Sequence, residues 1–208
     1  MKKLGIIICG LVLMMGCERN IYRFTEGSVY GTVYHVSYQS EVDYTVEIRQ
    51  EMERVNQSLS MFNKESVIAR WNRGESERVD SLFVTMYEKA REVYEATGGG
   101  FDITVAPLVN AWGFGFKNEK LPSDGKIDSL LQYVGMDKVQ LEGVRLVKLV
   151  EGVQIDASSI AKGLGVDLVA EFFDREGVQN YMIEIGGEIP KLGFTPNIFC
   201  AGKENTLQ

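Results

Sequence analysis

The chain has 208 residues, a formal net charge of -7 at pH 7 and 45% hydrophobic residues. This length suffices for one domain with a sizeable core. An acidic chain is a poor candidate for nucleic-acid binding, which needs a basic surface. A single histidine, His35, also argues against a histidine-rich transition-metal site.

Residues 1–16 are typical of a bacterial export signal. Two lysines open the segment, and residues 4–15 are apolar but too short to span a bilayer as a helix. Gly16 before Cys17 resembles a lipobox, so we expect cleavage before Cys17 and its acylation; an ordinary secretory signal is the alternative. Acyl chains would anchor the protein to a membrane on the periplasmic side of the cell envelope, either the inner or the outer one. Only Cys200 would then remain, so no intrachain disulfide is expected.

The first elements follow this segment directly. Residues 17–27 are predicted to form a tether, and the β-branched and aromatic residues 28–38 a strand. Apolar residues at steps of four and three predict an amphipathic helix from Ile48 to Phe62. By periodicity alone Phe62 belongs to the core. Residues 72–77 are polar and are expected to form a turn.

The second half alternates helices and strands. A helix is predicted from Leu82 to Tyr94, stopped by Gly98, and a short one from Ile127 to Val134. Three short apolar runs, separated by Glu-Gly pairs between residues 139 and 155, predict a three-stranded antiparallel meander. A long helix then runs from about Ser159 to Glu176, and residues 181–185 form a buried strand. The class is α+β with one domain.

A glycine-rich string between residues 98 and 115 is the most informative part of the sequence. It reads Gly98-Gly-Gly-Phe-Asp-Ile-Thr-Val-Ala-Pro-Leu-Val109 and continues to Trp112-Gly-Phe-Gly115. Glycines allow positive φ and expose N–H groups to a ligand, and Asp102 follows them closely. The alternative is a helix C-cap followed by a strand, which is preferable for the three glycines alone.

A second candidate site runs from Asp156 to Asp167. A strand delivers Asp156, and Ser158 or Ser159 starts the following helix, whose N-terminus suits a phosphate. Lys162 adds a cation, although the spacing of a Walker loop is missing. The structural alternative is that a serine caps the helix while Lys162 and Asp156 form a surface pair. Spacing alone favours neither reading.

Three weaker motifs also contain groups suited to ligand contact. They are Ser60 to Ser66 with Trp71-Asn72, Tyr30-Gly31-Thr32, and Gly186-Gly187-Glu188. In the last two, glycine permits close approach of the backbone.

Together and in this order, these motifs resemble the ApbE family of flavin transferases over roughly residues 28–193. The resemblance implies an incomplete ApbE-like (T-fold-like) domain with an antiparallel sheet and packed helices. It implies Mg2+-dependent transfer of FMN from FAD to a Thr or Ser hydroxyl of a target protein, with release of AMP. The implied acceptors are flavoprotein subunits of membrane redox complexes of the Nqr or Rnf type. The matching strings are Tyr30-Gly31-Thr32, residues 59–62 with Ser66, residues 99–109, Trp112-Gly113-Phe114-Gly115, residues 156–167 and residues 180–189.

The resemblance also assigns site residues. The Mg2+ contact falls on Ser159, and the FAD contacts fall on Tyr30, Phe62, Gly100, Phe101, Asp102, Asp156 and Lys162. Two positions depart from the family, which usually has Met at Tyr30 and often Tyr at Phe62. Phe62 keeps the ring but loses a hydroxyl.

The end of the chain departs further. Residues 194–208 do not resemble the family's continuation, which carries a His-rich turn and a later Asp and Thr that complete the Mg2+ site. We therefore expect a truncated chain that binds Mg2+ and FAD poorly, with inactivity as one outcome. The alternatives are a lipoprotein that binds or hydrolyses FAD without transferring FMN, and a surface lipoprotein with a structural or adhesive role.

Overall fold

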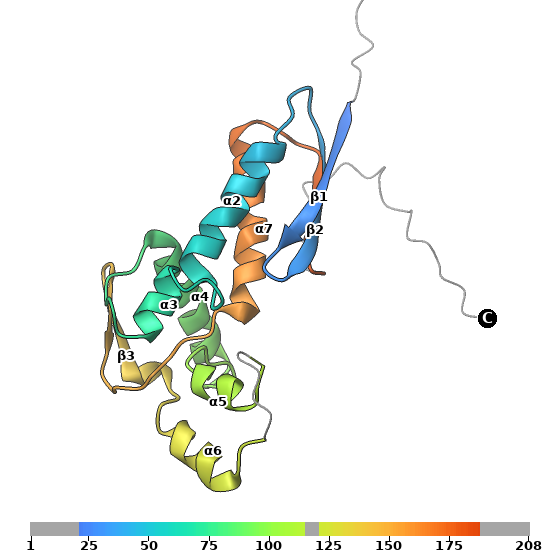
Figure 1. The fold of residues 1–208 in the computed structure, drawn as a ribbon. Helices are drawn as coiled ribbons and strands as arrows, with labels where there is room; N and C mark the ends of the chain where they lie inside the picture. Colours follow the sequence, from blue (N-terminus) through green and yellow to red (C-terminus); the bar gives the residue numbers. More distant parts are fainter. Residues whose placement is uncertain (1–20, 115–120, 188–208) are drawn as a thin grey trace, which may run out of the picture.

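The structure is a computed structural model that describes residues 21–114 and 121–187 (Figure 1). It confirms the α+β class. The elements in chain order are β1 (Tyr22–Val29), β2 (Thr32–Gln39), α2 (Thr45–Leu59), α3 (Val67–Asn72), α4 (Ser81–Ala96), α5 (Ala106–Ala111), α6 (Asp124–Leu131), the 3-10 helix η1 (Met136–Lys138), β3 (Val139–Glu142), β4 (Arg145–Lys148), α7 (Ser158–Arg175) and β5 (Tyr181–Ile185).

Several predictions lie outside the described residues. These are the export signal, the acylated Cys17, Gly115, the end of the last motif after Gly187, Cys200 and the aberrant tail 194–208. Within the described residues, no helix has both the length and the apolar character needed to cross a bilayer.

A three-stranded antiparallel sheet with the order β1-β2-β5 forms one layer, and α2 and α7 lie side by side against it (Figure 1). The side chains beneath the helices are buried, among them Val36, Tyr38 and Ile183. On the opposite face, His35 Nδ1 and Glu184 Oε2 lie 2.5 Å apart across β2 and β5. This bond and a backbone N–H hold the pKa of Glu184 below its usual value.

The N-terminal strand corrects two predictions. Residues 22–27 belong to β1 and not to a tether, and the single strand predicted over 28–38 is split by a hairpin turn. Tyr30 and Gly31 form this turn with φ values of 51° and 76°. Positive φ at both central residues is the geometry that suits the twist of a two-residue hairpin.

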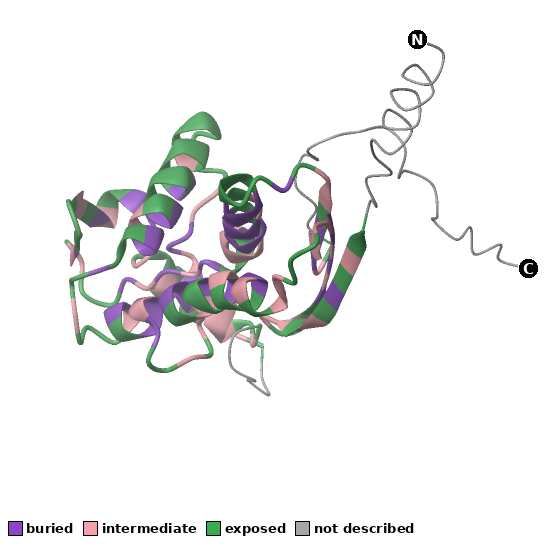
Figure 2. Ribbon diagram, turned by 90° about the horizontal axis from the view of Figure 1, so that it is seen from above, coloured by how far each residue is buried: buried purple, intermediate pink, exposed green. Residues whose placement is uncertain are grey.

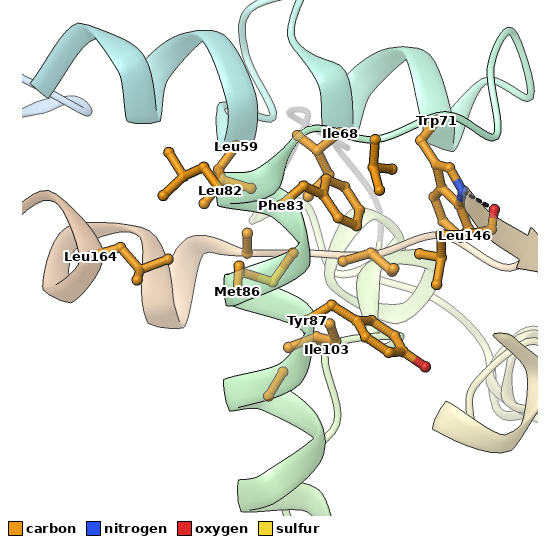
Figure 3. Close-up of a cluster of buried hydrophobic side chains, with 14 of the residues drawn as sticks. Leu59, Ile68, Trp71, Leu82, Phe83, Met86, Tyr87, Ile103, Leu146 and Leu164 are labelled. Atoms are coloured by element: carbon orange, nitrogen blue, oxygen red, sulfur yellow. Dashed lines mark hydrogen bonds between the residues drawn. The ribbon is translucent and has the colours of Figure 1, made fainter. Parts of the chain in front are cut away.

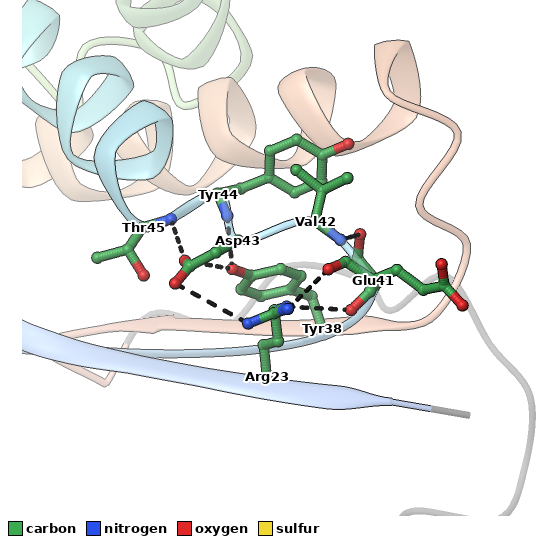
Figure 4. Close-up of polar contacts among 8 residues, drawn as sticks. Arg23, Tyr38, Glu41, Val42, Asp43, Tyr44 and Thr45 are labelled. Carbon is green, nitrogen blue, oxygen red and sulfur yellow. Dashed lines mark hydrogen bonds and ion pairs between the residues drawn. The ribbon is translucent and has the colours of Figure 1, made fainter. Parts of the chain in front are cut away.

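Polar contacts hold the start of α2 over the end of β2 (Figure 4). The Thr45 backbone N–H donates to Asp43 Oδ1 at 3.0 Å, and the Tyr44 N–H donates to the Tyr38 hydroxyl at 2.8 Å. Hydrogen bonds from Thr45 lower the pKa of Asp43. Arg23 reaches the same loop from β1, with Nη2 2.6 Å from the Glu41 carbonyl oxygen.

The far end of α2 corrects the prediction for Phe62. The helix ends at Leu59 because Ser60 takes an extended conformation, so the apolar stripe does not continue to Phe62. Phe62 is 73% exposed. The core role that periodicity favours for it is therefore wrong.

A larger hydrophobic core joins the C-terminal half of α2 to α3, α4 and the β3-β4 hairpin (Figure 3). The Trp71 ring is buried there, and its Nε1–H donates to the Leu146 carbonyl at 2.8 Å. Buried residues gather on the helix faces that turn toward one another, while the outer faces are exposed (Figure 2).

The predicted three-stranded meander is wrong in its third strand. β3 and β4 pair as an antiparallel hairpin, but Gln154 makes an isolated parallel bridge with Val105. Val153 and Ile155 are fully buried, and their segment lies between α3 and the glycine-rich string. The apolar alternation correctly indicates that Val153 and Ile155 are buried, but their segment pairs with Val105 and not with β4. The short helix near Ile127 is confirmed with earlier bounds, as α6.

Candidate functional site

The glycine run ends α4 and turns the chain toward the site. Gly98 and Gly99 have φ values of 60° and 85°, and the Gly99 N–H donates to the Tyr94 carbonyl at 2.9 Å. This is a glycine C-cap, as the structural alternative predicted. The strand expected after it is wrong, because a short turn leads straight into α5. Gly100 is exposed beside the cap, and a Cβ there would lie 3.3 Å from the Thr97 carbonyl oxygen.

Asp102 is oriented by a buried threonine. Its Oδ1 accepts the Thr104 backbone N–H at 2.7 Å and the Thr104 hydroxyl at 2.6 Å. The same Thr104 Oγ1 accepts the Gly135 N–H at 2.6 Å, and Thr104 is fully buried. Asp102 is itself half-buried, and Phe101 beside it packs against the larger core. Thr104 therefore connects the Asp102 carboxylate to the chain before β3.

Asp156 lies directly beside the Asp102 segment. Its backbone N–H donates to the Ile103 carbonyl at 2.8 Å, next to the parallel bridge between Val105 and Gln154. The structure thus joins the two strongest sequence motifs by backbone contacts, although about fifty residues separate them in the chain.

The Asp156 side chain bonds the first residue of α7. Of the two predicted starts, Ser158 and Ser159, the helix begins at Ser158, and the Ser158 N–H donates to Asp156 Oδ1 at 2.8 Å. The serine cap that the structural alternative proposed is therefore wrong. Ser159 is exposed in this first turn, and Lys162 is half-buried one turn later. A helix N-terminus with a nearby cation favours a bound phosphate.

Tyr30 packs against the second turn of the same helix. Its hydroxyl donates to the Met52 carbonyl at 2.7 Å, and a Cβ added at Gly165 would lie 2.8 Å from that hydroxyl. Burial raises the pKa of Tyr30 far above its usual range. The hydroxyl therefore acts as a hydrogen-bond donor within the fold.

The last motif meets the first at this end of the sheet. The Gly186 N–H donates to the Val33 carbonyl at 3.0 Å, and a Cβ at Gly186 would lie 2.7 Å from Thr32 Cγ2. Glycine at position 186 thus permits a close approach that any side chain would prevent. The Tyr30-Gly31-Thr32 turn and the Gly186-Gly187 turn are neighbours.

The segment after α2 reaches the site through Asn72. Met61 Sδ lies 3.6 Å from Asn72 Nδ2, and the same side-chain amide bonds the backbone of Ile155. Phe62 follows Met61 and is exposed.

The sequence did not predict that Thr104 and Asn72 hold this site in place. Thr104 follows Asp102 by two positions, and an Asp side chain that bonds the backbone two residues on is a known turn signal. Asn72 opens the segment predicted as a polar turn, whereas the structure makes it the last residue of α3. Its partner Ile155 lies 83 residues away, so local pattern carries no signal for the contact.

The described residues do not form a complete Mg2+ site. They contain no group of three or more His, Cys, Asp or Glu side chains suited to a metal. Ser159 offers one neutral hydroxyl, whereas Mg2+ prefers octahedral oxygen ligation with one or two carboxylates. A metal at Ser159 would need further ligands beyond that hydroxyl.

Comparisons with known proteins identify the family of the chain. The ApbE family model matches residues 30–198. An FAD:protein FMN transferase of Vibrio cholerae is 33% identical over 201 residues, covering 91% of this chain and 60% of the relative. One from Haemophilus influenzae is 36% identical over 214 residues, covering 93% of this chain and 62% of the relative.

Solved structures show the same fold. The flavin transferase ApbE from Vibrio cholerae matches with a TM-score of 0.77 and 34% identity, covering 81% of this chain and 58% of that structure. The apo form of the Pseudomonas stutzeri flavinyl transferase ApbE also gives a TM-score of 0.77, with 29% identity, covering 84% of this chain and 62% of that structure.

The fold is that of the ApbE structures, an α+β domain, and the chain belongs to the ApbE family. It spans about 60% of the length of the curated relatives named above.

Proposed function

We propose that the protein is an FAD:protein FMN transferase. One observation carries the proposal, namely the 2.8 Å hydrogen bond from the Asp156 N–H to the Ile103 carbonyl. This bond sets the backbone of the Asp102 segment beside the segment that leads into α7. An acidic side chain suited to a heterocycle would then bind the same ligand as a helix N-terminus, which favours phosphate. FAD combines both chemistries in one molecule.

In this proposal the site residues divide FAD between them. Gly100, Phe101 and Asp102 form one wall, with Asp102 accepting from a polar ring edge. Ser159 and Lys162 face the diphosphate, where the helix dipole and the ammonium group favour negative charge. Phe62 and Tyr30 supply aromatic surface, Phe62 as an exposed ring and Tyr30 as a ring held against α7. Asp156 would contact FAD with its carboxylate, which also orients the start of α7 through the Ser158 N–H.

The reaction would be a phosphoryl transfer. An acceptor Thr or Ser oxygen attacks the FMN phosphorus, the bond to the AMP phosphate breaks, and the hydroxyl proton leaves with solvent. Positioning and charge stabilisation provide most of the catalysis in such reactions. Mg2+ would neutralise diphosphate charge, but the described residues supply only part of a Mg2+ site, and no step is assigned to the metal. A Mg2+ requirement remains part of the proposal.

The acceptor and the location are also proposed. The acceptor would be a flavoprotein subunit of a membrane redox complex of the Nqr or Rnf type. An acylated Cys17 would hold the domain at a membrane surface on the periplasmic side, since two or more acyl chains give stable attachment. These assignments follow from the resemblance and from the N-terminal sequence.

A second function uses the same groups without transfer. An FAD-binding or FAD-hydrolysing lipoprotein needs the same cofactor contacts and no acceptor. The incomplete set of metal ligands in the described residues favours this alternative enough to require a direct test.

The test incubates the purified chain with FAD, Mg2+ and a Thr-containing acceptor peptide. Covalent flavin on the peptide together with AMP supports the transferase, AMP with free FMN supports the hydrolase, and bound FAD without AMP supports the binder. Asp102→Asn should weaken FAD binding, whereas Asp124→Asn on the exposed face of α6 is the matched control. An absence of FAD binding by the unaltered chain refutes the proposal.

A further inference from the structure

We propose that Asn72 is the positioning residue that holds Asp156 in the cofactor site. The proposal rests on the proposed function, in which Asp156 contributes to FAD binding. Asn72 would not touch FAD itself and would act through the backbone of Ile155.

The Asn72 side chain bonds Ile155 in both directions. Asn72 Nδ2–H donates to the Ile155 carbonyl at 2.9 Å, and the Ile155 N–H donates to Asn72 Oδ1 at 2.8 Å. A side-chain amide thus takes the place of a neighbouring strand. Ile155 is fully buried, so its backbone groups would otherwise lack partners at a substantial cost.

The other edge of the same segment is bound by the glycine-rich string. Asp156 donates its N–H to the Ile103 carbonyl at 2.8 Å, and Gln154 bridges Val105. Residues 154–156 therefore lie between two edges, with Asn72 on one and the Asp102 segment on the other. Asp156 directly follows Ile155, the residue that Asn72 bonds. The direction of the Asp156 side chain therefore depends on the contacts at both edges.

Asn72 is itself held firmly. It is the last residue of α3, and its carbonyl accepts the Lys148 Nζ–H at 3.1 Å. Lys148 Nζ also lies 4.4 Å from the centroid of the buried Trp71 ring, a cation–π contact. The Asn72 amide further contacts Met61 Sδ, which ties the segment containing Phe62 to the same point.

The experiment compares Asn72→Ala with the control Asn56→Ala. Asn56 lies on α2, where its amide bonds the exposed Glu53, so the control removes an asparagine amide without touching the site. Hydrogen–deuterium exchange of the peptide 153–159 and the Kd for FAD are measured on the full chain. We expect Asn72→Ala to speed exchange in this peptide, with α4 unchanged, and to weaken FAD binding at least tenfold, because the Asp156 carboxylate would no longer be held in place.

A double-mutant cycle separates positioning from general destabilisation. In the Asp156→Asn background the Asn72→Ala change should cost much less FAD affinity, because the carboxylate it positions is already gone. Equal losses in both backgrounds overturn the proposal. Unchanged exchange in peptide 153–159 of Asn72→Ala, or an unchanged Kd for FAD, also overturns the proposal. If the unaltered chain does not bind FAD, the proposed function fails, while the exchange result alone decides whether Asn72 holds the segment.

Asn72→Asp adds a pH dependence that a purely structural loss would not produce. A carboxylate keeps the acceptor but repels the Ile155 carbonyl, whereas the protonated acid again offers one donor and one acceptor. Relative to the unaltered chain at each pH, exchange protection and FAD affinity of Asn72→Asp should recover as the pH falls. Asn72→Ala should show no such recovery, and a flat ratio for Asn72→Asp refutes the mechanism. This variant also serves if Asn72→Ala fails to fold.

Discussion

Thr104→Val tests whether a buried hydroxyl organises the site. Valine has nearly the shape of threonine, so the change removes the hydroxyl and little else. The hydroxyl makes two short contacts, donating to Asp102 Oδ1 at 2.6 Å and accepting the Gly135 N–H at 2.6 Å. Both contacts are lost together.

The expected cost follows from the state of each partner. Gly135 is buried, and leaving its N–H without an acceptor costs about 1–3 kcal/mol. Asp102 is half-buried and keeps the Thr104 backbone N–H, so water replaces part of the lost bond and this loss adds roughly 1 kcal/mol. The free energy of unfolding should fall by about 2–4 kcal/mol. Thr104→Ser keeps the hydroxyl and loses a methyl group, so its cost should be about 1 kcal/mol.

Urea unfolding followed by circular dichroism measures both variants. Thr85→Val is the matched control, because the Thr85 hydroxyl bonds the Ser81 carbonyl on an exposed helix face. Its effect should stay within about 0.5 kcal/mol. The reasoning is refuted if Thr104→Val and Thr104→Ser are equally stable, since the hydroxyl would then contribute nothing that the methyl group does not.

Four further outcomes are expected, each measured from unfolding curves. Ser66→Ala removes the buried hydroxyl that caps α3 and should cost about 1–3 kcal/mol; a neutral effect contradicts the cap. Gly165→Ala should destabilise by about 1–3 kcal/mol because its methyl group would lie 2.8 Å from a tyrosine hydroxyl. Gly163→Ala, with open space around it, should instead stabilise by about 0.5–1 kcal/mol, and equal signs refute the packing argument. Because the pKa of Glu184 is lowered in the folded protein, its carboxylate contributes to the free energy of unfolding above pH 4.5, and this contribution is lost as the pH falls through the native pKa. Glu184→Gln should therefore reduce the loss of stability at acid pH. An unchanged loss of stability contradicts the His35 bond.

The sequence predicted the long helices well and the strands unevenly. Apolar periodicity and a glycine stop located α4 within two residues at each end. Most of β1 was missed because its less exposed positions include Arg23, Thr25 and Gly27, while Tyr22 and Phe24 are exposed, so the strand has no apolar alternation although its exposure alternates. The segment around Ile155 was predicted as a meander strand because alternation records burial and does not identify the partner.

For the site, the sequence predicted the ligand-contacting residues but not how their segments meet. Residues that would contact a ligand, such as Asp102 and Asp156, stand in recognisable strings, since the chemistry of binding needs particular groups at particular spacings. How those strings meet depends on contacts between distant segments. Phe62 was placed in the core because periodicity continues past the point where α2 ends.

The connecting residues are a different class from the ligand-contacting ones. Thr104 and Asn72 each satisfy backbone groups of a distant segment, Gly135 and Ile155 respectively. A polar side chain is costly to bury unless it is fully bonded, so such a contact forms only when both segments are in place. Each connector therefore couples the formation of the site to the completion of the fold. This is why loss of either side chain should disturb Asp102 or Asp156 without removing any group that meets FAD.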